Sequence, residues 1–175
     1  PHYELHNTVF LGDNLSLTNR FYYIEGEGYY ENYREDATAA DYALNFKPGV
    51  APDDELDLIR RKWVRKHHGG WVPGLEWNQN RGRLLVGGDW YTFHSSHWGN
   101  VLWAEGFSPA DFTEQFKYHE YTGDKDVYSL YANQRYRLGG GLTATVDLHF
   151  QHKEYSFFQK EVGNFIGDLR NAYTV

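Results

Sequence analysis

The stretch "RLGGGLTATVDLHFQHKEYSFF", Arg137–Phe158, alternates apolar and polar residues after a run of three glycines. The apolar positions are Leu142, Ala144, Val146, Leu148 and Phe150. The positions between them are polar: Thr143, Thr145, Asp147, His149, Gln151 and Lys153. Because successive side chains of a strand point to opposite faces of its sheet, this pattern predicts a strand with one apolar face and one polar, hydrated face.

A similar strand is predicted just before it, from about Lys117 to Leu138, with a tight glycine turn between the two. Apart from Gln134, one set of alternate positions is apolar or aromatic: Tyr128, Leu130, Ala132, Tyr136 and Leu138. The other set is mostly polar: Ser129, Tyr131, Asn133, Arg135 and Arg137. The apolar set of a membrane barrel faces lipid, whereas that of a small soluble barrel or sandwich faces the core. Alternation by itself is compatible with both arrangements.

The composition of the 175 residues excludes several classes of site. Aromatic residues make up 18 %, with 15 tyrosines, 11 phenylalanines and 6 tryptophans, and such residues favour strands and half-wet surfaces. The net charge of −7 argues against nucleic-acid binding, which needs a basic stripe. Without cysteine there is no disulfide, zinc–thiolate site or thiol nucleophile. No apolar run approaches the ~20 residues of a membrane helix.

About six long strands are predicted along the chain. Their ranges are Tyr3–Leu11, Leu15–Tyr30, Ile59–Trp77, Arg83–Trp103, Lys117–Leu138 and Leu142–Lys160. Short turns at 12–14, 78–82 and 139–141 alternate with a long segment at 31–58 and a medium loop at 104–116. The tail, residues 161–175, is predicted to be a loop leading to a possible seventh strand. Asp53–Arg61 has partial helical spacing, which leaves one or two turns of helix open as an interpretation.

Strand length and the sorting of connections favour a membrane barrel. Most of the predicted strands have close to twenty residues, whereas strands of globular proteins usually have about 5–6. Bacterial outer-membrane barrels have short periplasmic turns and long extracellular loops, and about 9–11 residues of each tilted strand cross the bilayer. Aromatic residues near strand ends fit an interfacial girdle, although aromatics also simply favour strands: Trp71, Trp77, Trp90, Tyr128 and Tyr136. The fold predicted is an all-β, antiparallel transmembrane β-barrel segment.

Several segments also resemble the strands of a known family. They are "PHYELHN", "LTNRFYYIEGEGYYENY", "WVRKHHGGWVPGLEW", "RLLVGGDWYTFHSSHWGNVLWAEG" and "KYHEYTGDKDVYSLYANQRYRLGGGLTATVDLHFQHKEY". In order and spacing they resemble consecutive barrel strands of TonB-dependent outer-membrane receptors, over nearly the whole chain. The resemblance implies a barrel of about 22 strands with a plugged lumen. It also implies import of a scarce nutrient, such as an iron–siderophore complex or cobalamin, powered by the TonB complex.

The chain departs from a whole receptor of this kind. It starts at Pro1 without any methionine, ends in "NAYTV" instead of a terminal aromatic residue, and shows neither a plug nor a TonB box. Residues 1–175 are therefore expected to be a partial barrel domain from the interior of a receptor, located in the bacterial outer membrane. Two alternatives stay open: a soluble, secreted β-sandwich that binds carbohydrate through exposed Trp and Tyr, and a complete small outer-membrane barrel.

The partners and the ligand-binding residues follow from the resemblance. The expected partners are outer-membrane lipid and lipopolysaccharide, a small-molecule or metal-chelate ligand, and the TonB complex acting through the missing plug, without nucleic acid. Ligand contacts are expected in the outer loops and the upper lumen, where aromatic and basic residues gather. The candidates are Arg60, Arg61, Trp63, Trp98 and Tyr118.

No motif predicts catalysis, a metal site or a cofactor. His67 and His68, like His94 and His97, point to opposite faces of a regular strand, so neither pair is expected to share an ion. There is no G-x-S-x-G or H-E-x-x-H sequence, and we expect a protein that is not an enzyme. The glycine pairs in "HHGG" and "VGGD" are expected to allow a bend or close packing beneath an aromatic ring. A loop cluster is expected to be solvated or bridged by cations: Asp53, Asp54, Glu55 and Asp57.

Overall fold

The protein is a single antiparallel sheet of seven strands that pair in chain order. The structure, a computed structural model, describes residues 1–113, 116–162 and 165–174. The strands are β1 His2–Phe10, β2 Leu15–Thr38, β3 Glu55–Gln79, β4 Gly82–Ala104, β5 His119–Gly139, β6 Leu142–Val162 and β7 Phe165–Thr174. Short 3₁₀ turns are η1 Ala39–Tyr42, η2 Leu44–Phe46 and η3 Pro109–Asp111. The all-β antiparallel prediction is confirmed, and the possible seventh strand, β7, takes up most of the tail that was predicted to be a loop.

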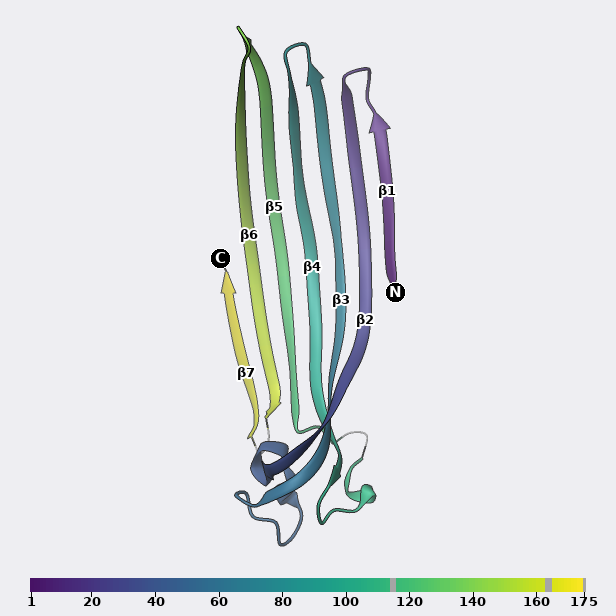
Figure 1. The fold of residues 1–175 in the computed structure, drawn as a ribbon, viewed down its shortest axis with the longest axis vertical. Helices are drawn as coiled ribbons and strands as arrows, with labels where there is room; N and C mark the ends of the chain where they lie inside the picture. The colour runs from purple at the N-terminus through teal and green to yellow at the C-terminus, as the bar shows by residue number, and fades with distance from the viewer. Residues whose placement is uncertain (114–115, 163–164, 175) are drawn as a thin grey trace.

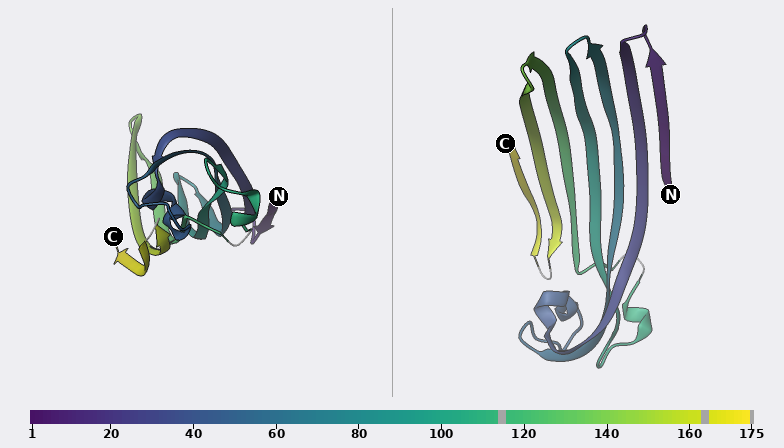
Figure 2. Two further views of the ribbon diagram at one scale, coloured as in Figure 1. Left: turned by 90° about the horizontal axis from the view of Figure 1, so that it is seen from below. Right: turned by 45° about the horizontal axis from the view of Figure 1, so that its top comes forward.

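The connections between strands are sorted by length, as predicted. The β1–β2, β3–β4 and β5–β6 turns lie together at one end of the sheet, and the loops that carry η1, η2 and η3 lie at the other (Figure 1). At the β5–β6 turn, Gly139, Gly140 and Gly141 all have positive φ, which glycine adopts without strain. Strands β1 and β7 form opposite edges of the sheet and do not pair with each other (Figure 2). The described residues therefore form an open sheet.

The short helix considered at Asp53–Arg61 is wrong, because β3 begins at Glu55 and runs through this segment. Leu56 pairs across the sheet with Ala37, and alternation places Leu58 in the buried cluster at the loop end, with no exposed surface. Strands β2 and β3 consequently extend further into the long polar segment than the sequence predicted. No helix among the described residues is long and apolar enough to span a membrane.

One face of the sheet carries a continuous apolar belt. Residues paired across antiparallel strands point to the same face, so the register defines rows that cross the sheet. One row is entirely aliphatic: Val9, Leu17, Leu75, Val86, Ala132 and Leu148. A second row, nearer the loop end, is aromatic: Phe21, Trp71, Trp90 and Tyr128. Trp77 and Tyr136 lie on the same face near the turn end. We call these residues the apolar belt and their side of the sheet the belt face.

The belt is largely open to its surroundings. Leu148 is 65 % exposed, and Trp90 is 53 % exposed. A contiguous apolar surface of this kind is unusual on a soluble monomer and marks a surface that something apolar covers. The same-face grouping predicted for the alternate residues from Leu142 to Phe150 is confirmed.

The opposite side of the sheet, which we call the polar face, carries Asp147, whose carboxylate accepts a hydrogen bond from the Asn133 side chain. Here the glycine pairs make room for rings, as predicted from the sequence. A Cβ at Gly70 would lie 2.7 Å from Cε1 of Tyr22, and one at Gly87 would collide with the Tyr131 ring. The polar face is therefore packed with large polar rings over glycine.

The main buried cluster lies beyond the belt, where the loop ends fold together. Its members are Ala37, Ala39, Tyr42, Leu44, Leu58, Val101, Ala104 and Tyr118. Lys47 ties η2 to the η3 loop, since its Nζ lies 3.1 Å from Oδ2 of Asp111. The cluster fixes the relative positions of the loop ends of β2 to β5. It leaves the belt without a protein layer among the described residues.

Candidate functional site

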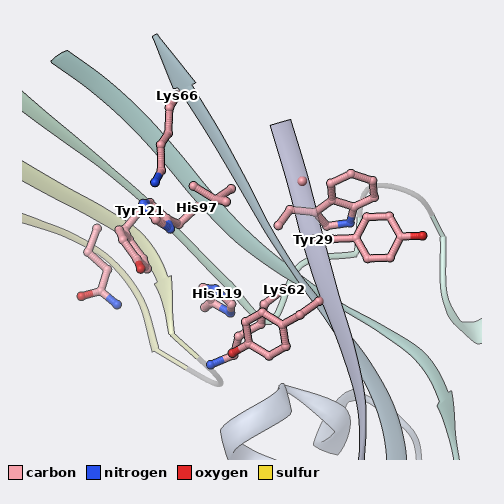
Figure 3. Close-up of a pocket in the computed structure, with 11 residues that line it drawn as sticks. Tyr29, Lys62, Lys66, His97, His119 and Tyr121 are labelled. Atoms are coloured by element: carbon pink, nitrogen blue, oxygen red, sulfur yellow. The ribbon is translucent and has the colours of Figure 1, made fainter. Parts of the chain in front are cut away.

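The candidate site is a pocket on the polar face, close to the loop-end cluster. Its volume is about 730 Å³, and β2 to β6 all contribute to its lining. Its polar and aromatic groups come mainly from Tyr30, Lys62, Lys66, His97, His119, Tyr121 and Gln159. Figure 3 shows His97, His119 and Tyr121 gathered on one side of β2 and Tyr29 on the other.

Strand register brings these side chains together. His97 pairs with Val64 on one side and with Tyr121 on the other. Alternation then places Lys62 and Lys66, each two residues from Val64, on that same face. Five strands thus project polar groups into one space, although Tyr30 and Gln159 are 129 positions apart in the sequence.

Stacked rings form one wall of the pocket. The His97 and Tyr121 ring centroids lie 4.6 Å apart with planes only 11° from parallel, and His119 stacks on Tyr121 at 5.9 Å. Gly99 makes this possible, because a Cβ there would lie 2.5 Å from Nδ1 of His119. The site therefore depends on a glycine that lets an imidazole lie directly on β4.

The charge of the pocket at neutral pH comes from its lysines. Burial, assisted by nearby Lys62, lowers the pKa of His119 to about 4. Burial also lowers the pKa of His97, with a further contribution from Lys66. Both imidazoles are consequently neutral at pH 7, and each offers one N–H donor and one acceptor. Two ammonium groups beside neutral donors form a site that suits an anionic ligand.

We expect the stability of the fold to fall as the pH drops from about 6.5 to about 4, in part because of His119. Below its ordinary pKa an unfolded His119 takes up a proton, whereas the folded residue resists it until about pH 4. The unfolded state then binds more protons, so stability rises with pH across this window and levels off on either side. His119→Gln should flatten this part of the profile. Urea unfolding followed by tryptophan fluorescence, between pH 4 and 7.5, measures it; an unchanged slope would contradict the assignment.

Three of the residues predicted from the sequence lie together, but on the belt face. The Trp63 and Trp98 rings are 5.7 Å apart and 6° from parallel, and Trp63 also borders the pocket. The Arg61 guanidinium lies 4.2 Å from the centre of the Tyr29 ring.

The other two predicted residues belong to the loop-end cluster. Arg60 Nη1 donates a hydrogen bond to the Tyr42 hydroxyl at 2.9 Å. Tyr118 is only 4 % exposed and its ring packs 4.8 Å from that of Tyr42. Their contacts hold η1 against the start of β5, so these residues act on the shape of the loop end.

Sequence reasoning did not select the pocket residues themselves. It did predict that His67 and His68, and likewise His94 and His97, face opposite ways, and the register confirms this. Counting alternate positions back from His68 would have aligned Lys66 and Lys62 on one face. The residues that the neighbouring strands add to the pocket could not be predicted in this way, because β-bulges shift the register near the loop end.

The acidic loop cluster makes local hydrogen bonds. Asp54 Oδ2 accepts from the Ala51 amide at 2.8 Å, and Asp57 Oδ1 accepts from the Asp36 amide at 3.2 Å. Within residues 1–113, 116–162 and 165–174, no group of three or more His, Cys, Asp or Glu side chains is arranged to hold a metal ion.

The site described above rests on the geometry of this chain alone. No family model matches the sequence, and neither the curated proteins nor the solved structures include a match to it.

Proposed function

We propose that residues 1–175 form part of the wall of an outer-membrane β-barrel of the TonB-dependent receptor type. The barrel would import a scarce nutrient, such as an iron–siderophore complex or cobalamin, and would have no catalytic residues and no cofactor. The observation that carries the proposal is the exposed apolar belt, an aliphatic row bordered by aromatic residues across six paired strands.

The dimensions of the belt suit a bilayer. Leu142–Phe150 covers nine positions, close to the ~9–11 tilted residues that cross the hydrocarbon core. Trp77 on the turn side and Trp71 on the loop side correspond to interfacial aromatic girdles. Covering a leucine side chain such as Leu148 with lipid recovers about 1.5–3 kcal/mol, which the open sheet does not gain by itself.

The two free edges support a larger barrel. Strands β1 and β7 each have one neighbour among the described residues, and lipid does not tolerate an unpaired strand edge. Further strands would close the wall, and a plug outside residues 1–175 would couple it to the TonB complex. A soluble carbohydrate-binding sandwich would instead need a second layer over the belt, and the described residues form one sheet.

In this orientation the polar face lines the lumen and the pocket lies near its outer mouth. Lys62 and Lys66, with neutral His97 and His119, suit an anionic small molecule or metal chelate on its way inward. Outer-membrane lipid and lipopolysaccharide would contact the belt face, and nucleic acid has no part.

Membrane fractionation tests the location. After expression in a Gram-negative host of the whole receptor chain that carries residues 1–175, the protein should sediment with outer membranes, remain there through a urea wash and need detergent for release. Recovery in the urea supernatant would contradict the proposal, because an apolar belt embedded in lipid is not removed by urea.

Charge reversal in the pocket tests the transport route. The double variant Lys62→Glu/Lys66→Glu should lower accumulation of radiolabelled ferric siderophore or cobalamin about tenfold or more, at unchanged protein level, by repelling an anionic ligand. Lys153→Glu, on the same face but far from the pocket, is the matched control. Equal uptake by the parent protein, the double variant and Lys153→Glu would show that the ligand does not pass through the pocket.

A further inference from the structure

A second surface with binding character lies on the belt face, beyond the aromatic row of the belt. Across β2, β3 and β4, Tyr29 pairs with Trp63 and Trp63 pairs with Trp98. We call these three residues the outer platform. The Trp63 and Trp98 rings are stacked, with planes 6° from parallel and centroids 5.7 Å apart. The Tyr29 ring lies 4.5 Å from Trp63 at a tilt of 52°. Three neighbouring strands therefore present a continuous aromatic surface.

The two tryptophans of the platform form the floor of a groove. Together with the η3 loop they enclose a volume of about 420 Å³, with Pro109 and Phe112 on the loop side. Asn100 also borders this groove, and its side-chain amide donates to the Phe116 carbonyl at 2.7 Å. The groove is thus an aromatic floor beside a wall that the loop-end cluster holds in place.

Balanced ion pairs surround the floor. Arg61 Nη2 lies 2.8 Å from the Glu31 carboxylate, and Arg65 pairs with Glu27. The Arg65 guanidinium lies 5.9 Å from the centre of the Trp98 ring. Each cation is matched by a carboxylate, so the rim offers hydrogen-bond donors and acceptors without a strong net charge.

The groove and the lumen pocket share Trp63 in their linings but open toward opposite faces of the sheet. Trp63 is eight residues from Trp71 along β3, which corresponds to about 26 Å at ~3.3 Å per residue. The side chains lie on the belt face, whereas Lys62, Lys66 and the stacked histidines lie on the polar face. A ligand in the groove would therefore touch the outside of the wall, above the level of the aromatic row.

We infer that the outer platform binds a saccharide, and that its source is the sugar portion of a glycolipid in the surrounding outer leaflet. A pyranose ring has one face of C–H groups, which packs on an aromatic ring, and an edge of hydroxyls, which bonds to paired carboxylates and guanidinium groups. The stacked indoles offer such an aromatic surface on the side that lines the groove. The platform lies on the same face as the apolar belt, which is proposed to contact lipid, so a glycolipid of the membrane is the source of the sugar that we favour. This choice of source rests on the proposed membrane location.

Three probes distinguish the sugar from the lipid. The purified protein in detergent is titrated with core oligosaccharide released from lipopolysaccharide, with intact lipopolysaccharide in mixed micelles, and with lipid A, which lacks the core sugars. Binding is measured by calorimetry and by tryptophan fluorescence. Trp63→Ala and Trp98→Ala should each weaken binding of both sugar-containing probes about tenfold, which corresponds to ~1.4 kcal/mol. Lys153→Gln, on the polar face and far from the groove, is the control and should bind like the parent protein.

The variants need a check that folding is intact. Glu27→Gln removes the negative charge and one carboxylate oxygen from the groove lining without touching a ring, and should weaken sugar binding with an unchanged urea midpoint. Unchanged affinity in Trp63→Ala, Trp98→Ala and Glu27→Gln, or equal binding of lipid A and lipopolysaccharide, would overturn the inference. Sugar binding that depends on both tryptophans in a protein that does not sediment with membranes would overturn the glycolipid source and the membrane proposal, while the saccharide site would stand.

Discussion

Leu148→Arg is expected to destabilise the membrane-inserted protein by about 2–4 kcal/mol, the cost of an arginine near the middle of the lipid-facing surface of a barrel. Leu148 lies in the aliphatic row, paired with Ala132, and is 65 % exposed on the belt face. In the proposed orientation the guanidinium would meet hydrocarbon. Urea unfolding in lipid vesicles, followed by tryptophan fluorescence, measures the change in the free energy of unfolding.

His149→Arg is the matched control, since it places the same side chain one position along the strand. His149 pairs with Tyr131 on the polar face, which is proposed to meet water. We expect a change within about 0.5 kcal/mol for this variant, as is usual for surface substitutions. If His149→Arg lowered the free energy of unfolding more than Leu148→Arg, the polar face and not the belt face would meet lipid, which would contradict our account.

Gly87→Val is expected to destabilise the fold by about 1–3 kcal/mol, the range for side chains forced into a packed site. A Cβ at Gly87 would lie 2.7 Å from the Pro73 carbonyl oxygen and would collide with the Tyr131 ring. The ring can move, but the Pro73 carbonyl belongs to the backbone of β3. The loss should appear as a lower urea midpoint.

A second glycine provides the control for Gly87→Val. Gly28 also lies in a strand, and a Cβ there would have no neighbour within 4 Å. Gly28→Val should therefore be neutral or slightly stabilising, because valine favours strands more than glycine does. Adding Tyr131→Ala to Gly87→Val should recover only part of the loss. Equal effects of the two glycine substitutions would show that lost flexibility, and not crowding, is being measured.

The strands were predictable from the sequence because their pattern is local. Period-two alternation from Leu142 to Phe150 and the glycine turn before it fix both the strand and the face of each residue. The rings over Gly70 and Gly87 were also anticipated, since glycine within a strand marks close approach.

The sites were less predictable because they depend on register between distant strands. Trp63 and Trp98 were selected as aromatic residues, but only pairing shows that they stack and that they share the belt face. Tyr118 looked available for a ligand, yet the fold of η1 and η2 buries it against Tyr42. These loop contacts have no periodic signal in the sequence.

The central claim, that lipid covers the belt face and water the polar face, is tested most directly by cysteine scanning. The natural chain has no cysteine, so a single cysteine at each position from 142 to 151 carries the only spin label. In the membrane-inserted protein, accessibility to oxygen and to a water-soluble nickel reagent is read at each site by electron paramagnetic resonance. The account predicts alternation with a period of two: oxygen access highest at Leu142, Ala144, Val146, Leu148 and Phe150, and nickel access highest at the positions between them. Equal nickel access on both faces, or the reverse alternation, would contradict it.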